Sequence, residues 1–132
     1  MESNSVIIQG RVITGLGKGR IFLSKKGYRR QLMDKFGIDP IEGTLNLYTT
    51  ETDKLKILNE SEGLQIEGFV EEGIQYGSVK AFSAEIHGLK VAVVFPTRTT
   101  HKNMIEVVSE HHLRNELDIE DEDMLSVEIF LR

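Results

Sequence analysis

Residues 79–95 read VKAFSAEIHGLKVAVVF, and this stretch predicts two strands joined by a tight turn. Both halves are rich in apolar and β-branched side chains, which favour strands. His87 and Gly88 stand between the halves, where glycine tolerates the positive φ angles of a two-residue hairpin. The chain is therefore expected to contain an antiparallel hairpin in its second half.

Further strands are expected on both sides of this hairpin. They are predicted at residues 6–14, 21–23, 44–48, 64–70, 105–108 and 124–131. Gly10 lies within the first of them and is expected to mark a bulge or a bend. Many short strands with few helices predict an all-β fold, in the form of a small barrel with crossing connections.

One or two short helices are expected among the strands. In residues 28–36, apolar side chains recur at i, i+4 and i+8 (Tyr28, Leu32 and Phe36), Met33 is expected to widen this stripe, and Gly37 follows as a C-terminal stop. Residues 112–117 predict one or two further helical turns. Residues 49–63 are polar and acidic, and they are expected to form a loop or a short irregular piece. The acidic run 118–123, DIEDED, is expected to form a solvated turn before the last strand.

Size and composition are those of an ordinary soluble protein. The 132 residues fit one domain, residues 1–132, with 39% hydrophobic and 28% charged residues. There is no cysteine, so disulfides, thiolate metal sites and a cysteine nucleophile are excluded. No apolar run approaches the ~18 residues of a membrane helix, and residues 1–5 do not resemble a signal peptide. We expect a cytoplasmic protein without a membrane partner.

The charge balance bears on possible partners. The net charge is −5, which speaks against general nucleic-acid binding, because that depends on a positive field facing the phosphates. A local basic patch could still hold one nucleotide. No long apolar stripe stands out on the surface, so a monomer is expected.

Residues 15–20, GLGKGR, have the chemistry of a loop that holds phosphate groups. Three glycines let the backbone approach a ligand closely, so that successive N–H groups can surround an anion. Lys18 and Arg20 add positive charge. The segment matches neither a Walker loop nor a dinucleotide fingerprint, and a flexible hairpin loop is an equally good interpretation of it alone.

Thr44 and Asn46 are two residues apart in a predicted strand, so their side chains share one face. Leu45 and Leu47 then point into the core. A hydroxyl and an amide oxygen suit magnesium, which takes oxygen ligands and leaves positions for water and phosphate. The alternative is a pair of polar residues on a solvated strand face.

Three other polar segments are candidates for ligand contacts. Residues 96–101 (PTRTTH) follow an apolar strand and offer hydroxyls and an arginine, or they form a surface loop. Glu106 interrupts an apolar strand, so it lies either on an exposed face or in a site. Residues 111–114 (HHLR) contact a nucleotide or simply begin a helix. No zinc-ligand spacing and no Ser-His-Asp arrangement is found.

Taken together, these segments resemble the archaeal CTP-dependent riboflavin kinases. The matching motifs, in the family's order, are G-x-V at 10–12, GLGKGR at 15–20, FLS at 22–24, EGTLNL at 42–47, P-x-R-T-x-H at 96–101 and LR at 113–114. Each motif is weak alone, but the combination is specific and spreads over most of the chain.

The resemblance implies a closed, six-stranded barrel of the cradle-loop (RIFT-like) kind and a phosphoryl transfer. The 5′-hydroxyl of riboflavin would attack the γ-phosphate of CTP, giving FMN and CDP, with magnesium as cofactor. The nucleotide contacts that it implies are Gly15, Leu16, Gly17, Lys18, Gly19, Arg20, His111, His112, Leu113 and Arg114. Thr44 and Asn46 would hold magnesium, and Thr99 and Glu106 would contact the flavin. We assign Glu106 as the candidate base or orienting group for the attacking hydroxyl.

Two other functions stay open. One is a barrel module that binds flavin or nucleotide without catalysis, and the other is a DNA-binding protein of related β architecture, which the acidic charge disfavours. Within the enzyme class, ATP is an alternative phosphate donor, because residue spacing does not reveal base preference.

Overall fold

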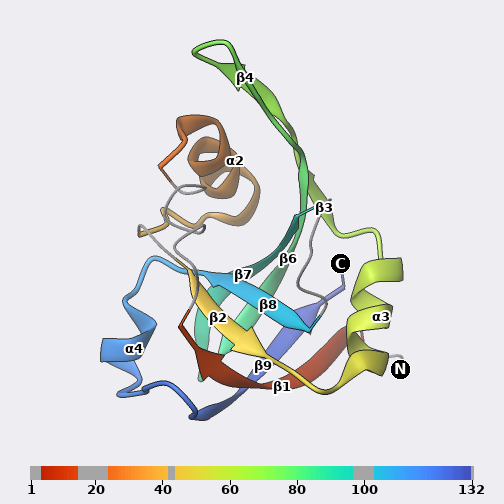
Figure 1. Cartoon of the computed structure of the whole chain (residues 1–132), viewed down its shortest axis with the longest axis vertical. Helices are drawn as coiled ribbons and strands as arrows, with labels where there is room; N and C mark the ends of the chain where they lie inside the picture. The colour runs from red at the N-terminus through yellow and green to blue at the C-terminus, as the bar shows by residue number, and fades with distance from the viewer. Residues whose placement is uncertain (1–3, 15–23, 42–43, 97–102, 132) are drawn as a thin grey trace.

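The computed structural model describes residues 4–14, 24–41, 44–96 and 103–131. The elements in chain order are β1 (Ser5–Ile13), α2 (Lys26–Phe36), β2 (Leu45–Tyr48), α3 (Thr52–Glu60), β3 (Leu64–Ile66), β4 (Phe69–Glu71), β5 (Ile74–Tyr76), β6 (Val79–Ile86), β7 (Leu89–Pro96), β8 (Met104–Val108), α4 (Leu113–Glu116) and β9 (Met124–Phe130). Figure 1 shows the strands curling around a common centre, with helices outside them.

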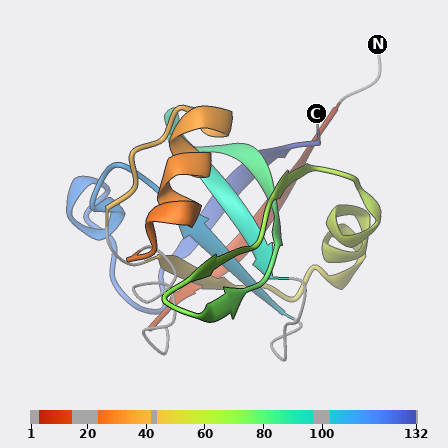
Figure 2. The same cartoon turned by 90° about the horizontal axis from the view of Figure 1, so that it is seen from above.

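Six of the strands close into an antiparallel barrel. They follow the order β6-β7-β8-β2-β1-β9, and β9 returns to pair with β6, where Ala84 faces Ile129. β3 adds a short seventh strand along the first half of β6. The view of Figure 2, from above, shows the same ring of strands. The predicted all-β fold with a closed six-stranded barrel is confirmed.

The predicted hairpin is the most regular part of this barrel. β6 and β7 pair without interruption from Val79–Pro96 to Ile86–Leu89. His87 and Gly88 both take positive φ, 50° and 80°, as a primed two-residue turn requires. The hairpin prediction is confirmed.

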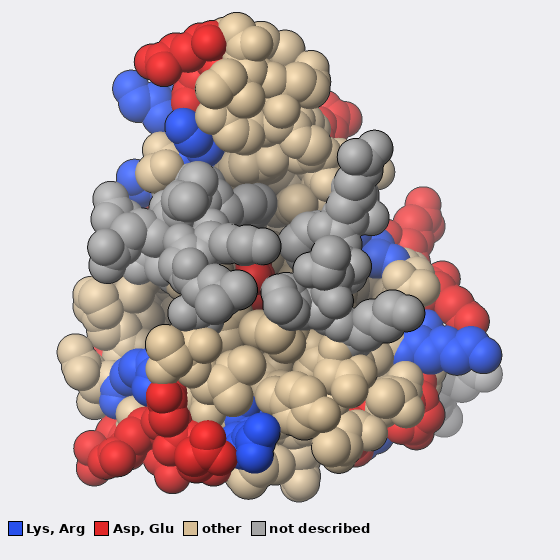
Figure 3. Space-filling model, in the orientation of Figure 1, with Lys and Arg blue, Asp and Glu red and all other residues tan. Residues whose placement is uncertain are grey.

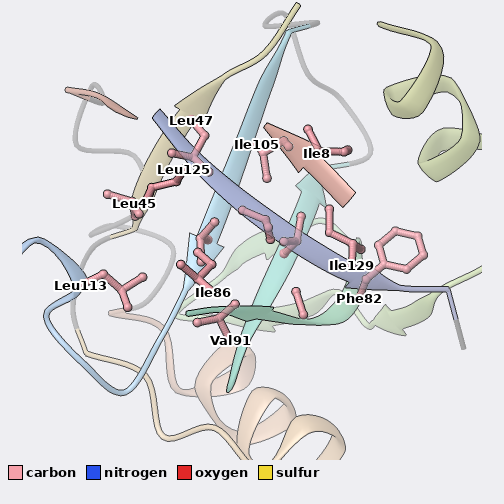
Figure 4. Close-up of a cluster of buried hydrophobic side chains, with 14 of the residues drawn as sticks. Ile8, Leu45, Leu47, Phe82, Ile86, Val91, Ile105, Leu113, Leu125 and Ile129 are labelled. Carbon is pink, nitrogen blue, oxygen red and sulfur yellow. The ribbon is translucent and has the colours of Figure 1, made fainter. Parts of the chain in front are cut away.

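Alternating side chains of the strands fill the interior of the barrel. Figure 4 shows this cluster, with Ile8, Leu47, Phe82, Ile105 and Ile129 converging from five different strands. Each of these side chains is 2% exposed or less. Burial of this apolar surface supplies the main driving force for closing the sheet.

Helices α3 and α4 lie on opposite sides of the barrel (Figures 1 and 2) and add to its interior. α3 contributes Leu55 and Leu58, and α4 contributes Leu113. The prediction of helical turns near residues 112–117 is confirmed. The prediction of an irregular segment over residues 49–63 is wrong, because Thr52–Glu60 is a helix that buries Leu55 and Leu58 against the barrel.

The C-terminal end of α3 is held by a lysine from a distant strand. The Nζ of Lys80 on β6 donates hydrogen bonds to the carbonyl oxygens of Leu58, Asn59 and Ser61 at 3.0, 2.8 and 2.8 Å. These are among the carbonyls that a helix end leaves without intrahelical donors. Partial burial lowers the pKa of Lys80. The lysine therefore fixes α3 to the barrel.

Helix α2 packs on the outer face of the barrel. Its buried residues are Tyr28, Leu32 and Phe36, which are the residues of the predicted apolar stripe. Gly37 ends the helix at φ 67°, and its N–H bonds back to the last turn. The stripe of these three residues and its stop are thus confirmed, but the prediction that Met33 widens the stripe is wrong, because its side chain points to solvent and is 52% exposed. None of the described helices has the length and apolar character needed to cross a bilayer.

The segment predicted as one strand at residues 64–70 is instead two short strands. β3 ends at Ile66, and β4 and β5 then form a separate two-stranded sheet that projects from the barrel (Figure 1). Glu72 and Gly73 both have positive φ in the turn of this arm. The ring of Phe69 packs edge-on against Tyr28 of α2 at 4.7 Å between centroids, so the arm is anchored on the helix.

Gly10 does not mark a bulge. β1 pairs with β9 in unbroken register from Ser5 to Arg11, and Gly10 faces Leu125. A Cβ on Gly10 would lie 2.9 Å from the Cβ of Leu47. Glycine is therefore needed here because β2 approaches the strand closely, not because the strand is irregular.

We expect Lys80→Met to lower the free energy of unfolding by about 1–3 kcal/mol, because the carbonyls at the end of α3 lose a charged donor. Lys56→Met is the control, because Lys56 lies on α3 with its side chain 75% exposed and pairs with Glu60 on the same helix. Urea unfolding followed by circular dichroism measures both. Equal stability of the two variants would contradict the role of Lys80.

Candidate functional site

Strands β2 and β8 bring Asn46 and Glu106 together on the outer face of the barrel. The two residues are direct partners in the antiparallel register. Leu45 and Leu47 flank Asn46 and face the interior, so Asn46 points outward, as the period-two pattern predicts. Its exposure is only 8%. The outer face therefore holds a mostly buried amide next to a carboxylate.

The end of β1 reaches the same place. Ile13 pairs with Asn46 from the side opposite to Glu106. Asn46 thus lies between β1 and β8, and the chain leaves β1 toward residues 15–20 directly beside it. Residues far apart in the sequence meet here because β2 is flanked by these two strands in the closed barrel.

The side-chain amide of Asn46 makes one hydrogen bond within its own strand segment. The Nδ2 of Asn46 donates to the carbonyl oxygen of Thr44 at 3.4 Å, which turns the amide oxygen away from that contact. The described residues contain no group of three or more His, Cys, Asp or Glu that could hold a metal. The expected ligands of a cation here, the hydroxyl of Thr44 and the amide oxygen of Asn46, are oxygen atoms of the kind that magnesium takes.

A pocket of about 240 Å³ opens beside Thr44. Its lining residues are Ile41, Thr44, Leu45, Val107, Ser109, His111, His112, Leu113, Arg114 and Asn115. The fold thus brings Thr44 to the predicted segment 111–114, which is more than sixty positions away in the sequence. Ile41 and Ser109 were not singled out in the sequence, and they meet through a backbone hydrogen bond of 2.9 Å.

The four residues of segment 111–114 have different surroundings. Leu113 is 5% exposed and belongs to the barrel interior (Figure 4). The Nδ1 of His111 lies 3.1 Å from the Oε1 of Glu116, and its backbone N–H donates to the Oγ of Ser109. His112 precedes the first turn of α4. The pocket wall is therefore partly apolar and partly basic.

Arg114 belongs to a charged cluster at the edge of the pocket. Its Nη2 donates to the Oδ1 of Asp121 at 2.7 Å and to the carbonyl oxygen of Ile13 at 3.3 Å. The Oγ1 of Thr14 donates to the other carboxylate oxygen of Asp121 at 2.5 Å. The hydrogen bond from Thr14, followed by that from Arg114, lowers the pKa of Asp121.

Part of the predicted site lies outside the described residues. This holds for Gly15, Leu16, Gly17, Lys18, Gly19, Arg20 and Thr99, and for the strand predicted at 21–23. Among the described residues, Thr44 and segment 111–114 line one pocket. Asn46 and Glu106 face each other across β2 and β8 and are not among the lining residues of that pocket.

Charged side chains are unevenly spread over the face that contains β2 and β8. In Figure 3, acidic side chains gather near the end of the molecule where α4 and the start of β9 lie. The described Lys and Arg side chains on this face form separate small groups. No continuous basic surface joins these groups among the residues coloured there.

The fold and the pocket define a closed antiparallel barrel with a candidate ligand site where β1, β2, β8 and α4 meet. A family model named for CTP-dependent riboflavin kinases, described as a domain of unknown function, DUF120, matches residues 12–129. The chain therefore belongs to the CTP-dependent riboflavin kinase family, and the resemblance seen in the sequence is confirmed.

Several archaeal proteins named riboflavin kinase are similar to the chain. The one from Ignicoccus hospitalis is 40% identical over 131 residues, covering 97% of this chain and 73% of that protein. The one from Thermoplasma acidophilum is 39% identical over 129 residues, covering 96% and 59%. The one from Archaeoglobus fulgidus is 39% identical over 133 residues, covering 98% and 57%. The chain thus spans between 57% and 73% of these relatives.

Proposed function

We propose that the chain phosphorylates the 5′-hydroxyl of riboflavin with the γ-phosphate of CTP, giving FMN and CDP. The observation that carries this proposal is the meeting of Thr44 with segment 111–114 around one pocket, while Asn46 faces Glu106 on the adjoining strands. Family membership and the names of the relatives point to the same reaction.

Each part of the site has a proposed role. Residues 15–20 and 111–114 would hold the nucleotide, with loop amides, lysine and arginine offsetting the charge of the phosphates. Thr99 and Glu106 would contact the flavin. Thr44 and Asn46 would hold magnesium, which, when bound, neutralises charge on the phosphate oxygens.

The protein promotes this reaction mainly by aligning the reactants, not by forming covalent bonds with them. A bond forms between the riboflavin 5′-oxygen and the γ-phosphorus while the bond from that phosphorus to the oxygen bridging it to the β-phosphate breaks, and CDP leaves with that electron pair. The hydroxyl proton passes to the carboxylate of Glu106, which also orients the oxygen. The register of β2 and β8, in which Asn46 faces Glu106, supports this role.

The other functions have less support. A module that only binds flavin or nucleotide has no need of a carboxylate at the position of Glu106, opposite Asn46. A DNA-binding role would require a positive surface, whereas the chain carries a net charge of −5. ATP instead of CTP is the alternative donor, and the described pocket residues do not discriminate between the two bases.

Product formation is the direct test of this function. The protein is incubated with riboflavin, magnesium and either CTP or ATP, and flavins are separated by chromatography. We expect FMN with CTP and little with ATP. FMN with ATP alone would overturn the choice of donor. Absence of FMN with both nucleotides would overturn the kinase proposal.

Glu106→Gln should lower turnover by ~10²-fold or more, because glutamine keeps the shape of the side chain but cannot accept the proton. Glu85→Gln is the control, since Glu85 is an exposed carboxylate on β6. Initial rates of FMN formation under saturating substrates measure the effect. Turnover close to that of the control would remove Glu106 from the base role.

Thr44→Val should raise the magnesium concentration needed for half-maximal rate by at least about tenfold. Loss of a residue that merely hydrogen-bonds to a metal ligand already lowers metal affinity by about tenfold or more, and loss of a ligand itself should cost at least as much. The substitution keeps the shape of the side chain and removes only the ligand oxygen. Thr50→Val, at an exposed position just beyond β2, is the control. An unchanged magnesium titration in Thr44→Val would exclude Thr44 as a ligand.

A further inference from the structure

We infer that Asp121 is a positioning residue of the nucleotide pocket, which holds the guanidinium of Arg114 in the pocket wall and ties it to the end of β1. Asp121 belongs to the acidic run 118–123, DIEDED, which the sequence alone presents as a solvated turn. The inference rests on the proposed function in so far as the ligand of this pocket is a nucleotide.

The two oxygens of the Asp121 carboxylate contact two different segments. One accepts from Arg114 on α4, seven residues away, and the other accepts from Thr14, 107 residues away. Arg114 in turn donates to the carbonyl oxygen of Ile13. The carboxylate therefore links α4 directly to the last residues before segment 15–20.

Backbone hydrogen bonds fix the turn that carries Asp121. The N–H of Glu122 donates to the carbonyl oxygen of Val12, and the N–H of Val12 donates to the carbonyl oxygen of Asp123, both at 2.8 Å. The N–H of Ile119 donates to the carbonyl oxygen of Arg114 at 3.0 Å. Because the backbone is tied to both neighbours, the position of the carboxylate is set before any ligand binds.

Asp121 contacts one nitrogen, Nη2, of the Arg114 guanidinium. Both hydrogen bonds of the guanidinium use Nη2, while Nε and Nη1 donate to no described residue. Arg114 also lines the pocket. A guanidinium held in this way keeps donors for an anionic ligand and loses the rotational freedom that binding would otherwise have to remove.

The negative charge of the Asp121 carboxylate makes the inference testable. A carboxylate close to a pocket for a triphosphate repels that ligand, so removing the carboxylate should tighten binding if charge alone matters. If Asp121 instead holds Arg114 in place, removing it should weaken binding. The two explanations therefore predict opposite changes in the affinity for the nucleotide.

The experiment compares the full chain with Asp121→Ala, Asp121→Asn and a control, Glu122→Gln. Glu122 is the adjacent acidic residue, its side chain is 71% exposed, and it pairs with Arg11 at 3.3 Å. Binding of CTP with magnesium is measured by titration calorimetry, the KM for CTP and for riboflavin by FMN formation, and folding by the melting temperature.

We expect Asp121→Ala to raise the Kd and the KM for CTP by about fivefold, the scale of a partly exposed charged contact. Asp121→Asn should have a smaller effect, because it keeps one acceptor for Arg114. The kcat and the KM for riboflavin should change by less than about twofold in both variants. Glu122→Gln should bind CTP as the unchanged chain does, or slightly more tightly.

Two results would overturn the inference. One is unchanged or tighter CTP binding in Asp121→Ala, and the other is a fall in kcat and melting temperature without a change in the affinity for CTP. If the unchanged chain forms no FMN but Asp121→Ala still weakens CTP binding, the inference stands and the kinase proposal fails. If the unchanged chain binds no CTP, both fail.

Discussion

The pairing of β6 with β9 is the contact on which the rest of the structure depends. It joins Ala84 to Ile129 and so turns a row of strands into a closed barrel. Closure removes the free edge that β9 would otherwise expose and encloses the apolar cluster of Figure 4. Within the closed barrel, β1 lies between β9 and β2. The end of β1 meets Asn46 through its own pairing with β2, in which Ile13 faces Asn46.

The barrel separates packing from chemistry by the alternation of its strands. On β2 and β8, Leu45, Leu47, Ile105 and Val107 face inward and are buried, while Asn46 and Glu106 share the outer face. Packing of the apolar residues holds the strands in place, and this also holds the polar residues between them in place. A site built on paired strands in this way is placed more accurately than a site made of loops alone.

Local patterns in the sequence predict the elements whose own residues decide their structure. The β6–β7 hairpin, the apolar stripe of α2 and the alternation in β2 are of this kind. α3 is not, since its surface is mostly polar and the donor for its C-terminal carbonyls is Lys80, from a strand twenty residues further on. The arm of β4 and β5 is anchored by packing of Phe69 on α2, which a local pattern does not reveal.

The candidate site likewise contains features that local sequence predicts and features that depend on distant contacts. The spacing of two predicts a common face for Thr44 and Asn46, but the opposition of Asn46 and Glu106 depends on the register of two strands, and these residues are 60 positions apart in the sequence. Asp121 is the extreme case, since six consecutive residues are acidic or apolar in a run that resembles a solvated turn. Only the backbone ties of that turn to Val12 single out one carboxylate for Arg114 and Thr14. Neighbouring carboxylates of this run therefore have different partners, because the fold decides which of them reaches Arg114 and Thr14.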